Sequence, residues 1–151
     1  MFLSTLEAYR RKYNFRVHAY ALLPDHYHLM VSFPPHKELV NFLRDFKSMV
    51  GKKVVAWLLE EKLDGLLACF QLRKVRRRPR DAQYCVLQYN SYVKPVLGVA
   101  AIRQKLQYIH LNPVRAGLAA TPEAYPYSSA PAYAGKGLTW VKIDRLELPY
   151  D

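Results

Sequence analysis

The sequence predicts one mixed α/β domain built on an antiparallel sheet, and three patterns carry that prediction. Residues 15–23 alternate between apolar and polar side chains with a period of two, which is typical of a strand. Residues 26–33 follow the turn signal Pro24-Asp25 and predict a second strand, so the two form a hairpin. Segments 36–63 and 98–112 repeat apolar residues every three or four positions, which indicates helices.

The other elements follow from the same patterns. Residues 3–13 predict a short helix that Ser4 caps and Asn14 ends. The helix over 36–63 is expected to bend, or to be closely approached by another backbone, at Gly51. Its expected buried stripe consists of Leu39, Leu43, Phe46, Val50, Val54, Trp57 and Leu58.

The second half of the chain contains one clear helix. Residues 84–96 predict a strand or ribbon. In the helix over 98–112 the buried row is Ile102, Leu106 and Ile109, and Asn112-Pro113 is expected to end it because the residue before proline avoids the helical region. We expect one domain over 1–151, with a core over 1–118 and a wrapping tail over 119–151 that has a short extended piece at 140–143.

Composition narrows the classes of function. No apolar run approaches the roughly 20 residues that span a bilayer, no secretory signal is expected at Met1–Leu6, and two cysteines make neither a disulfide framework nor a zinc-type spacing. A cytoplasmic protein is therefore expected. Against 12 acidic residues there are 23 Lys and Arg, a net charge of +11. This balance favours a nucleic acid over a membrane surface as the partner, and tyrosines such as Tyr20, Tyr89 and Tyr92 can stack on bases.

The basic residues gather most densely between positions 73 and 80. Such a cluster is either a solvated, mobile loop or an arm that contacts phosphates, and we favour the arm because Asp81 is its only acidic neighbour. The candidate DNA contacts are Lys47, Lys52, Lys53, Arg73, Lys74, Arg76, Arg77, Arg78, Arg80 and Arg115.

Two further pairs of side chains suggest chemistry. His26 and His28 are two residues apart in a predicted strand, so both rings leave the same face and make half of a metal site. Tyr108 and Asn112 are four apart on a predicted helix and share a face, which pairs a potential nucleophile with an amide oxygen. Alone, each pair has an ordinary alternative: surface histidines on a strand, or a core tyrosine and a helix-capping asparagine. His110 faces away from Tyr108 and is expected to be structural or DNA-facing.

The residues around these pairs carry a family resemblance. Asp-His-Tyr-His-Leu-Met-Val at 25–31, Tyr-Ile-His-Leu-Asn-Pro-Val-Arg-Ala-Gly-Leu at 108–118 and Pro-Glu-Ala-Tyr-Pro-Tyr-Ser-Ser at 122–129 resemble the REP-associated tyrosine transposases of the single-tyrosine HUH family. The resemblance extends from Phe15 to Tyr133. It implies a ferredoxin-like antiparallel sheet with helices packed on one face.

The resemblance also implies roles for single residues. His26, His28 and Asn112 match the ligands of a divalent metal, Mg²⁺ or Mn²⁺, although Zn²⁺ competes from ligand type alone. Tyr108 matches the nucleophile that forms a 5′-phosphotyrosine link. Family members usually begin with a strand ahead of the first helix, for which the printed sequence has no counterpart. Three interpretations of the missing strand are open: a true N-terminus upstream of Met1, a substitute strand from the tail, or an incomplete sheet.

The function predicted from this resemblance is metal-dependent cleavage and strand transfer of single-stranded, hairpin-forming repeat DNA. Such an enzyme would act in the cytoplasm at the nucleoid, as a monomer or homodimer, without a membrane partner. The first alternative is an inactive or domesticated protein that binds hairpin DNA without cutting it. The second is an RNA-binding protein, because charge and tyrosines do not distinguish the two sugars.

Overall fold

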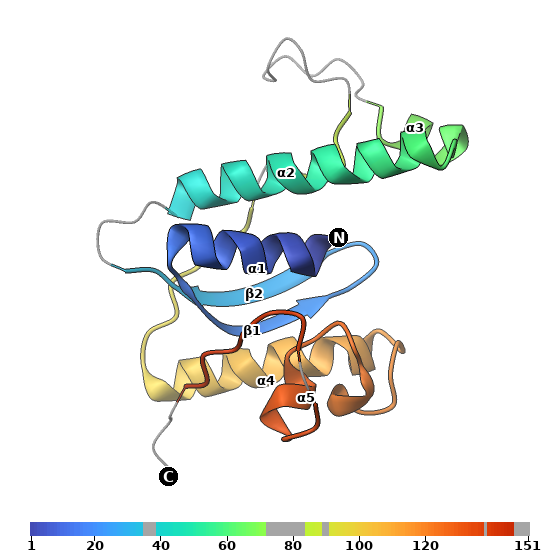
Figure 1. Ribbon diagram of the computed structural model, residues 1–151. Coiled ribbons are helices and arrows are strands. Elements are labelled where there is room, and N and C mark those ends of the chain that lie inside the picture. The colour runs from blue at the N-terminus through green and yellow to red at the C-terminus, as the bar shows by residue number, and fades with distance from the viewer. Residues whose placement is uncertain (35–38, 72–83, 89–90, 138, 147–151) are drawn as a thin grey trace. The chain divides into compact units, whose positions relative to one another are not determined.

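The computed structural model describes residues 1–34, 39–71, 84–88, 91–137 and 139–146, and these form several helices and one hairpin (Figure 1). The elements in chain order are α1 (Phe2–Tyr13), β1 (Arg16–Leu22), β2 (Tyr27–Ser32), α2 (Leu39–Glu60), α3 (Asp64–Cys69), α4 (Val99–Arg115), a 3₁₀ turn η1 (Pro122–Ala124) and α5 (Ala130–Tyr133). The predicted mixed α/β class is confirmed. None of the described helices is long and apolar enough to cross a membrane.

The described chain divides into two compact units. The first comprises Met1–Leu6 and Glu38–Tyr92, and the second comprises Glu7–Lys37 and Val93–Asp151. The boundary falls inside α1, whose first turn belongs to the first unit and whose remainder belongs to the second. Each unit has its own buried apolar residues.

In the first unit, α2 buries a row of side chains spaced by four or eight residues. The row is Phe42, Phe46, Val50 and Leu58, and the rings of Phe42 and Phe46 stack with centroids 5.4 Å apart. Phe2 meets Phe46 edge to face at 5.0 Å. The predicted stripe is confirmed at Phe46, Val50 and Leu58 and was wrong at Trp57, which is 42% exposed. It missed Phe42, which is fully buried, whereas Leu39, Leu43 and Val54 are half-buried.

Two further predictions for this unit were wrong. A Cβ added at Gly51 would meet no atom within 4 Å, so no backbone approaches there and α2 continues through it. Helix α1 begins two residues before Ser4, whose hydroxyl donates to the Met1 carbonyl instead of capping the helix. Its end at Asn14 is confirmed by the positive φ of 49° at that residue.

The segment after α2 also differs from the prediction. Residues 64–69 form the short helix α3, which the sequence did not suggest. The strand predicted over 84–96 was wrong within the described residues, where only a single antiparallel bridge joins Gln71 and Tyr84.

The second unit is organised on the β1–β2 hairpin. The strands are antiparallel, with Ala21 opposite His28 and Leu22 opposite Tyr27, and a register shift lies between Val17 and Ala19. Helix α4 packs against one face through Ile109, with Ile102 and Leu106 beside it; the strand residues in this cluster are Ala19, Ala21, Leu23 and Met30. Figure 1 shows α4 running alongside the hairpin. The predicted helix row is thereby confirmed.

Polar residues of β1 are buried as well as apolar ones, which the alternating pattern did not predict. His18 is 6% exposed, because its Nδ1 bonds the Asp144 carbonyl at 2.7 Å and its Nε2 bonds the Ser32 hydroxyl at 2.8 Å. Tyr20 is 2% exposed. Tyr20 is therefore not the stacking surface for bases that the sequence suggested.

The C-terminal tail lies along the outer edge of β1. Ser128 forms an antiparallel bridge with Ala21, the Leu22 N–H donates to the Tyr127 carbonyl at 2.9 Å, and the Asp144 N–H donates to the Val17 carbonyl at 2.8 Å. The tail thus supplies a single bridge and scattered hydrogen bonds to this edge, not a full strand.

Candidate active site

The hairpin places both predicted histidines beside each other. The Leu23 N–H donates to the His26 carbonyl at 2.8 Å, which closes the turn through Pro24 and Asp25. His26 then lies just before β2 and His28 is the second residue of the strand. Because side chains two apart in a strand share a face, the two imidazoles are neighbours, with ring centroids 5.0 Å apart at 84°.

Helix α4 brings Tyr108 to these rings. Ile109 is 2% exposed and packs against the hairpin, so its neighbour Tyr108 lies at the border of the α4 face that contacts the strands. The Tyr108 ring meets the His28 ring edge to face, with centroids 5.3 Å apart at 77°. Tyr108 remains 38% exposed.

Asn112 lies one helical turn beyond Tyr108. Its Nδ2 donates to the Tyr108 carbonyl at 3.3 Å. This bond uses the amide nitrogen and leaves Oδ1 as the atom that would face a cation. Two neutral imidazoles and an amide oxygen are ligands that a divalent ion accepts, with positions left for phosphate oxygens and water.

The hydrogen bonding of the histidines fits such a role. The His26 Nδ1–H donates to the Asp25 carboxylate at 2.6 Å, which lowers the pKa of Asp25 and leaves His26 Nε2 as the nitrogen with the lone pair in the neutral ring. His28 Nε2 is buried and has no hydrogen-bond partner among the described residues. Burial first, and then the positive charges of His26 and Lys105, lower the pKa of His28 and favour its neutral form. An unpaired lone pair on a neutral imidazole suits a metal ion.

The described residues contain no cluster of three or more His, Cys, Asp and Glu side chains that could hold a metal. Among the residues that the structure describes, a metal site at His26 and His28 therefore needs a third ligand of another type, and the sequence resemblance implies the Asn112 amide for this place. Two imidazoles and an amide oxygen can hold a divalent ion, and these ligand types do not by themselves distinguish Mn²⁺ or Mg²⁺ from Zn²⁺.

Two cations lie against the ring of Tyr108. Lys105 Nζ is 4.7 Å from the ring centroid and Arg115 Cζ is 5.6 Å from it. Both come from α4, three residues before Tyr108 and seven after it, and so share its face. They bring positive charge to the place where a scissile phosphate would meet the phenol.

The chain is similar to known proteins in two comparisons, one with a family model and one with a solved structure. The family model described as "Transposase IS200 like" matches residues 1–62, which include both histidines. The chain resembles the IS200-like transposases. A solved structure of a REP-associated tyrosine transposase bound to a REP hairpin matches with a TM-score of 0.52 at 16% identity, covering 100% of this chain and 79% of that one. At this identity the likeness is one of fold alone. No curated protein matches the chain.

Helix α4 continues further than the proline predicted. The prediction that Asn112-Pro113 ends it was wrong, since the helix runs through Pro113 to Arg115. Gly117 then adopts φ 68° and donates to the Val114 carbonyl at 3.0 Å, while the Leu118 N–H donates to the Pro113 carbonyl at 2.8 Å. These two bonds form a Schellman motif, which is the usual helix end at a glycine. The segment Asn-Pro-Val-Arg-Ala-Gly-Leu at 112–118 is thus a helix end with its cap.

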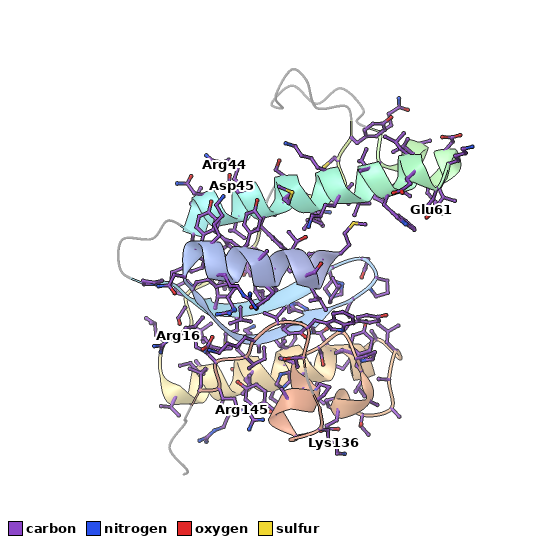
Figure 2. The ribbon with its side chains drawn as sticks, viewed as in Figure 1. Arg16, Arg44, Asp45, Glu61, Lys136 and Arg145 are labelled. Carbon is purple, nitrogen blue, oxygen red and sulfur yellow. The ribbon has the colours of Figure 1, made fainter. Side chains whose placement is uncertain are left out.

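The candidate cations on α2 are partly used within the protein. Lys47 Nζ donates to the Gln88 carbonyl at 2.8 Å, and burial lowers the pKa of Lys47. Lys53 Nζ donates to the Thr5 hydroxyl at 3.0 Å. Lys52 is exposed. Figure 2 also shows Arg44 beside Asp45, with Nε 3.0 Å from Oδ1, so this helix is less positive than its sequence suggests.

The other candidates for DNA contact are the basic residues between positions 73 and 80 and the tyrosines suggested to stack on bases. Arg73, Lys74, Arg76, Arg77, Arg78 and Arg80 lie outside the described residues, as does Tyr89. Tyr92 is described and is 84% exposed. Of the tyrosines proposed to stack on bases, Tyr92 is therefore the one that the structure places at the surface.

His110 links α4 to the tail, a role that the sequence left open. Its Nε2 bonds the Ser129 hydroxyl at 2.8 Å, and burial lowers the pKa of His110 to about 4. Ser129 in turn accepts from the Tyr20 N–H at 2.9 Å. Helix α4 is thereby tied to β1 through the tail. The sequence analysis missed Lys105 and Ser129. The spacing of three residues between Lys105 and Tyr108 on one helix could have indicated Lys105, whereas no pattern in the sequence indicated Ser129.

Proposed function

We propose that this chain cleaves and rejoins single-stranded DNA through a covalent 5′-phosphotyrosine intermediate, as a transposase of the IS200-like type does. Its nucleophile is Tyr108. His26, His28 and the Asn112 amide oxygen would hold a divalent metal, Mg²⁺ or Mn²⁺. It acts on DNA in the cytoplasm, at the nucleoid.

The contact between Tyr108 and His28 is the observation that carries the proposal. The two residues are 80 positions apart in the sequence, yet their rings are 5.3 Å apart, and His26 is the next ring along at 5.0 Å. All of these residues belong to one compact unit. His28 Nε2 is buried and has no hydrogen-bond partner among the described residues, and the partly exposed Tyr108 ring lies beside it. This combination suits a metal-assisted attack on phosphorus better than it suits a packing role.

The reaction is a direct displacement at phosphorus. The Tyr108 phenol gives up its proton and its oxygen bonds to the phosphorus atom. The bond from phosphorus to the 3′-oxygen of the preceding nucleotide breaks, and that oxygen takes a proton to become a free 3′-hydroxyl. The new tyrosine–5′-phosphate bond retains the energy of the phosphodiester, so a second 3′-hydroxyl can reverse the step without ATP.

The side chains around Tyr108 have separate tasks in this step. A divalent ion at His26, His28 and Asn112 would supply Lewis-acid polarisation of the phosphate and charge stabilisation of the leaving oxygen. Lys105 and Arg115 attract the phosphate to the Tyr108 ring, and the contact with His28 holds that ring in one orientation.

A hairpin is the proposed form of the substrate. The solved transposase that shares this fold is bound to a REP hairpin. The net charge of +11 favours a polyanion, and attack on a phosphate in a paired strand would require the duplex to open. Single-stranded DNA next to a hairpin offers both an accessible phosphate and a recognisable shape.

The test is a covalent adduct. The chain is incubated with Mn²⁺ and a set of 5′- and 3′-labelled hairpin oligonucleotides with single-stranded flanks, and then denatured with SDS. A band that carries the 3′ label is expected, and it is lost in Tyr108→Phe and in His28→Ala. Tyr127→Phe is the matched control, because Tyr127 is also exposed, at 49%, and makes no contact with the histidines that the structure records.

Other outcomes separate the alternatives. Binding to the hairpins without any adduct would replace the proposal with an inactive hairpin-binding protein. Tighter binding to matched RNA than to DNA hairpins would replace it with an RNA-binding protein. Loss of binding and adduct together in His28→Ala would mean that the histidines support the fold.

A further inference from the structure

Helix α4 carries the candidate nucleophile in the middle of a stripe of four side chains. The stripe consists of Lys105, Tyr108, Asn112 and Arg115, which are three, four and three residues apart and therefore share a face of the helix. Its order is cation, phenol, amide and cation. Lys105 Nζ and Arg115 Cζ lie 4.7 and 5.6 Å from the centroid of the Tyr108 ring, so both charges lie at the candidate active site.

These two cations have no ion-pair partner in the part of the chain that the structure describes. The recorded ion pairs lie on α1, on α2 and between Asp25 and His26. Lys105 and Arg115 are both exposed, so an anion can reach them from solvent. An anion that approaches the phenol therefore meets two donors that no carboxylate neutralises.

The candidate metal ligands add no negative charge to this face. Two imidazoles and an amide oxygen are neutral, and the nearby carboxylate of Asp25 accepts from His26 Nδ1 at 2.6 Å. The Tyr108 ring lies between Lys105 and His28, 4.7 Å from the ammonium and 5.3 Å from the imidazole. The ammonium is thus within about 10 Å of the His28 ring, which is the Debye length at 0.1 M salt. The charge of Lys105 acts on His28 over this distance.

This balance of charges disfavours a divalent ion when nothing else is bound. Sites for such ions gain affinity from the negative charge of their ligands, and the three candidate ligands here supply none. The ammonium of Lys105 adds repulsion. For charges of +1 and +2 about 8 Å apart in water, Coulomb's law corresponds to a loss of affinity of about fivefold.

We infer that Lys105 makes metal binding by this chain dependent on DNA, because its ammonium opposes a divalent ion until a phosphate is bound. A phosphate supplies the negative charge that the site lacks, and Lys105 and Arg115 can both donate to its oxygens. Metal and DNA then bind cooperatively, and each raises the affinity of the other by the same factor. The inference rests on the proposed function for the metal ligands and for DNA as the anion, and it adds a coupling between the two.

The test measures Mn²⁺ binding and needs no cleavage. The parent protein is the full chain with Tyr108→Phe, which keeps the aromatic ring and cannot form the adduct. The electron paramagnetic resonance signal of free Mn²⁺ is followed with and without a saturating amount of the hairpin oligonucleotide that the parent binds most tightly. His28→Ala in the parent, with the same DNA, gives the Mn²⁺ that the DNA takes up by itself. After subtraction of this amount, we expect DNA to tighten Mn²⁺ binding by about tenfold or more.

Substitutions of single charges assign the effect to Lys105. Without DNA, Lys105→Gln in the parent should bind Mn²⁺ about fivefold more tightly, and Lys105→Arg, which keeps the charge, should bind it as the parent does. Lys136→Gln is the matched control. Lys136, labelled in Figure 2, is also exposed, but its charge acts on Glu123 and is not among those recorded as acting on His28.

The outcomes separate this inference from the proposed function. Equal Mn²⁺ affinity with and without DNA would overturn the inference, as would a Lys105→Gln variant that binds Mn²⁺ no more tightly than Lys136→Gln. Both results leave the adduct at Tyr108 in the unsubstituted chain as evidence for the proposed function. Mn²⁺ binding that His28→Ala does not weaken, or failure to bind any hairpin, would overturn both proposals.

Discussion

Removal of the Ser129 hydroxyl is expected to destabilise the second unit strongly, because three groups depend on it. The side chain is fully buried, and its Oγ lies 2.9 Å from the Tyr20 nitrogen, 3.3 Å from the Tyr20 carbonyl oxygen and 2.8 Å from His110 Nε2. Ser129→Ala leaves the Tyr20 N–H and the imidazole nitrogen without partners. A buried polar group left unsatisfied costs about 1–3 kcal/mol, so the expected loss is about 2–4 kcal/mol.

Urea unfolding followed by far-ultraviolet circular dichroism measures this loss, and Ser128→Ala is the matched control. Ser128 is equally buried, but its hydroxyl makes only local bonds, at 3.3 Å to the Tyr125 carbonyl and at 3.2 Å from the Ala130 N–H. We expect it to cost about 1 kcal/mol. A smaller loss for Ser129→Ala than for Ser128→Ala would refute the reasoning.

Three other substitutions or pairs give direct tests. Glu7→Gln should lower the free energy of unfolding at pH 7, because two arginines lower the pKa of Glu7 to about 2 and its carboxylate therefore stabilises the folded state. This contribution is lost as Glu7 is protonated, so urea unfolding should show the variant and the wild type becoming equally stable between about pH 4.5 and 2. Gly51→Ala should stabilise α2 by about 1 kcal/mol, whereas Gly117→Ala at φ 68° should cost about 1 kcal/mol, both by thermal unfolding. Lys105→Ala and Arg115→Ala should each reduce the slope of log affinity for DNA against log salt by about one.

The hairpin was predictable because its signals are local. Period-two alternation and the Pro24-Asp25 turn lie within one stretch, and the strands form where the pattern places them. The burial of His18 and Tyr20 was not predictable, because their partners Asp144 and Ser129 come from the tail more than 100 residues later. Short polar residues in an aperiodic segment give no sign of which strand they will meet.

The errors in the helices have physical causes. Pro113 removes only one hydrogen bond near the end of α4, and its full burial together with the Schellman bonds at Gly117 offsets that loss. In α2, Trp57 and Leu58 are adjacent apolar residues, so the sequence could not show which one faces inward.

The candidate site was predicted in part. Side chains two residues apart in a strand share a face, as do side chains four apart on a helix. The sequence therefore showed that His26 lies beside His28 and that Tyr108 and Asn112 are on the same face of α4. That the face with His28 meets the face with Tyr108 came from the family resemblance, and the ring contact at 5.3 Å agrees with it.

The tail along β1 has a consequence for solubility. Ser128 and Asp144 occupy backbone groups of an edge strand that would otherwise be open to pairing with another molecule. A protein shortened to end after Gly117 would present the Leu22 N–H and the Val17 carbonyl to its neighbours. Exposed edges of this kind promote aggregation between chains, so the tail protects the hairpin from self-association as well as fixing α4.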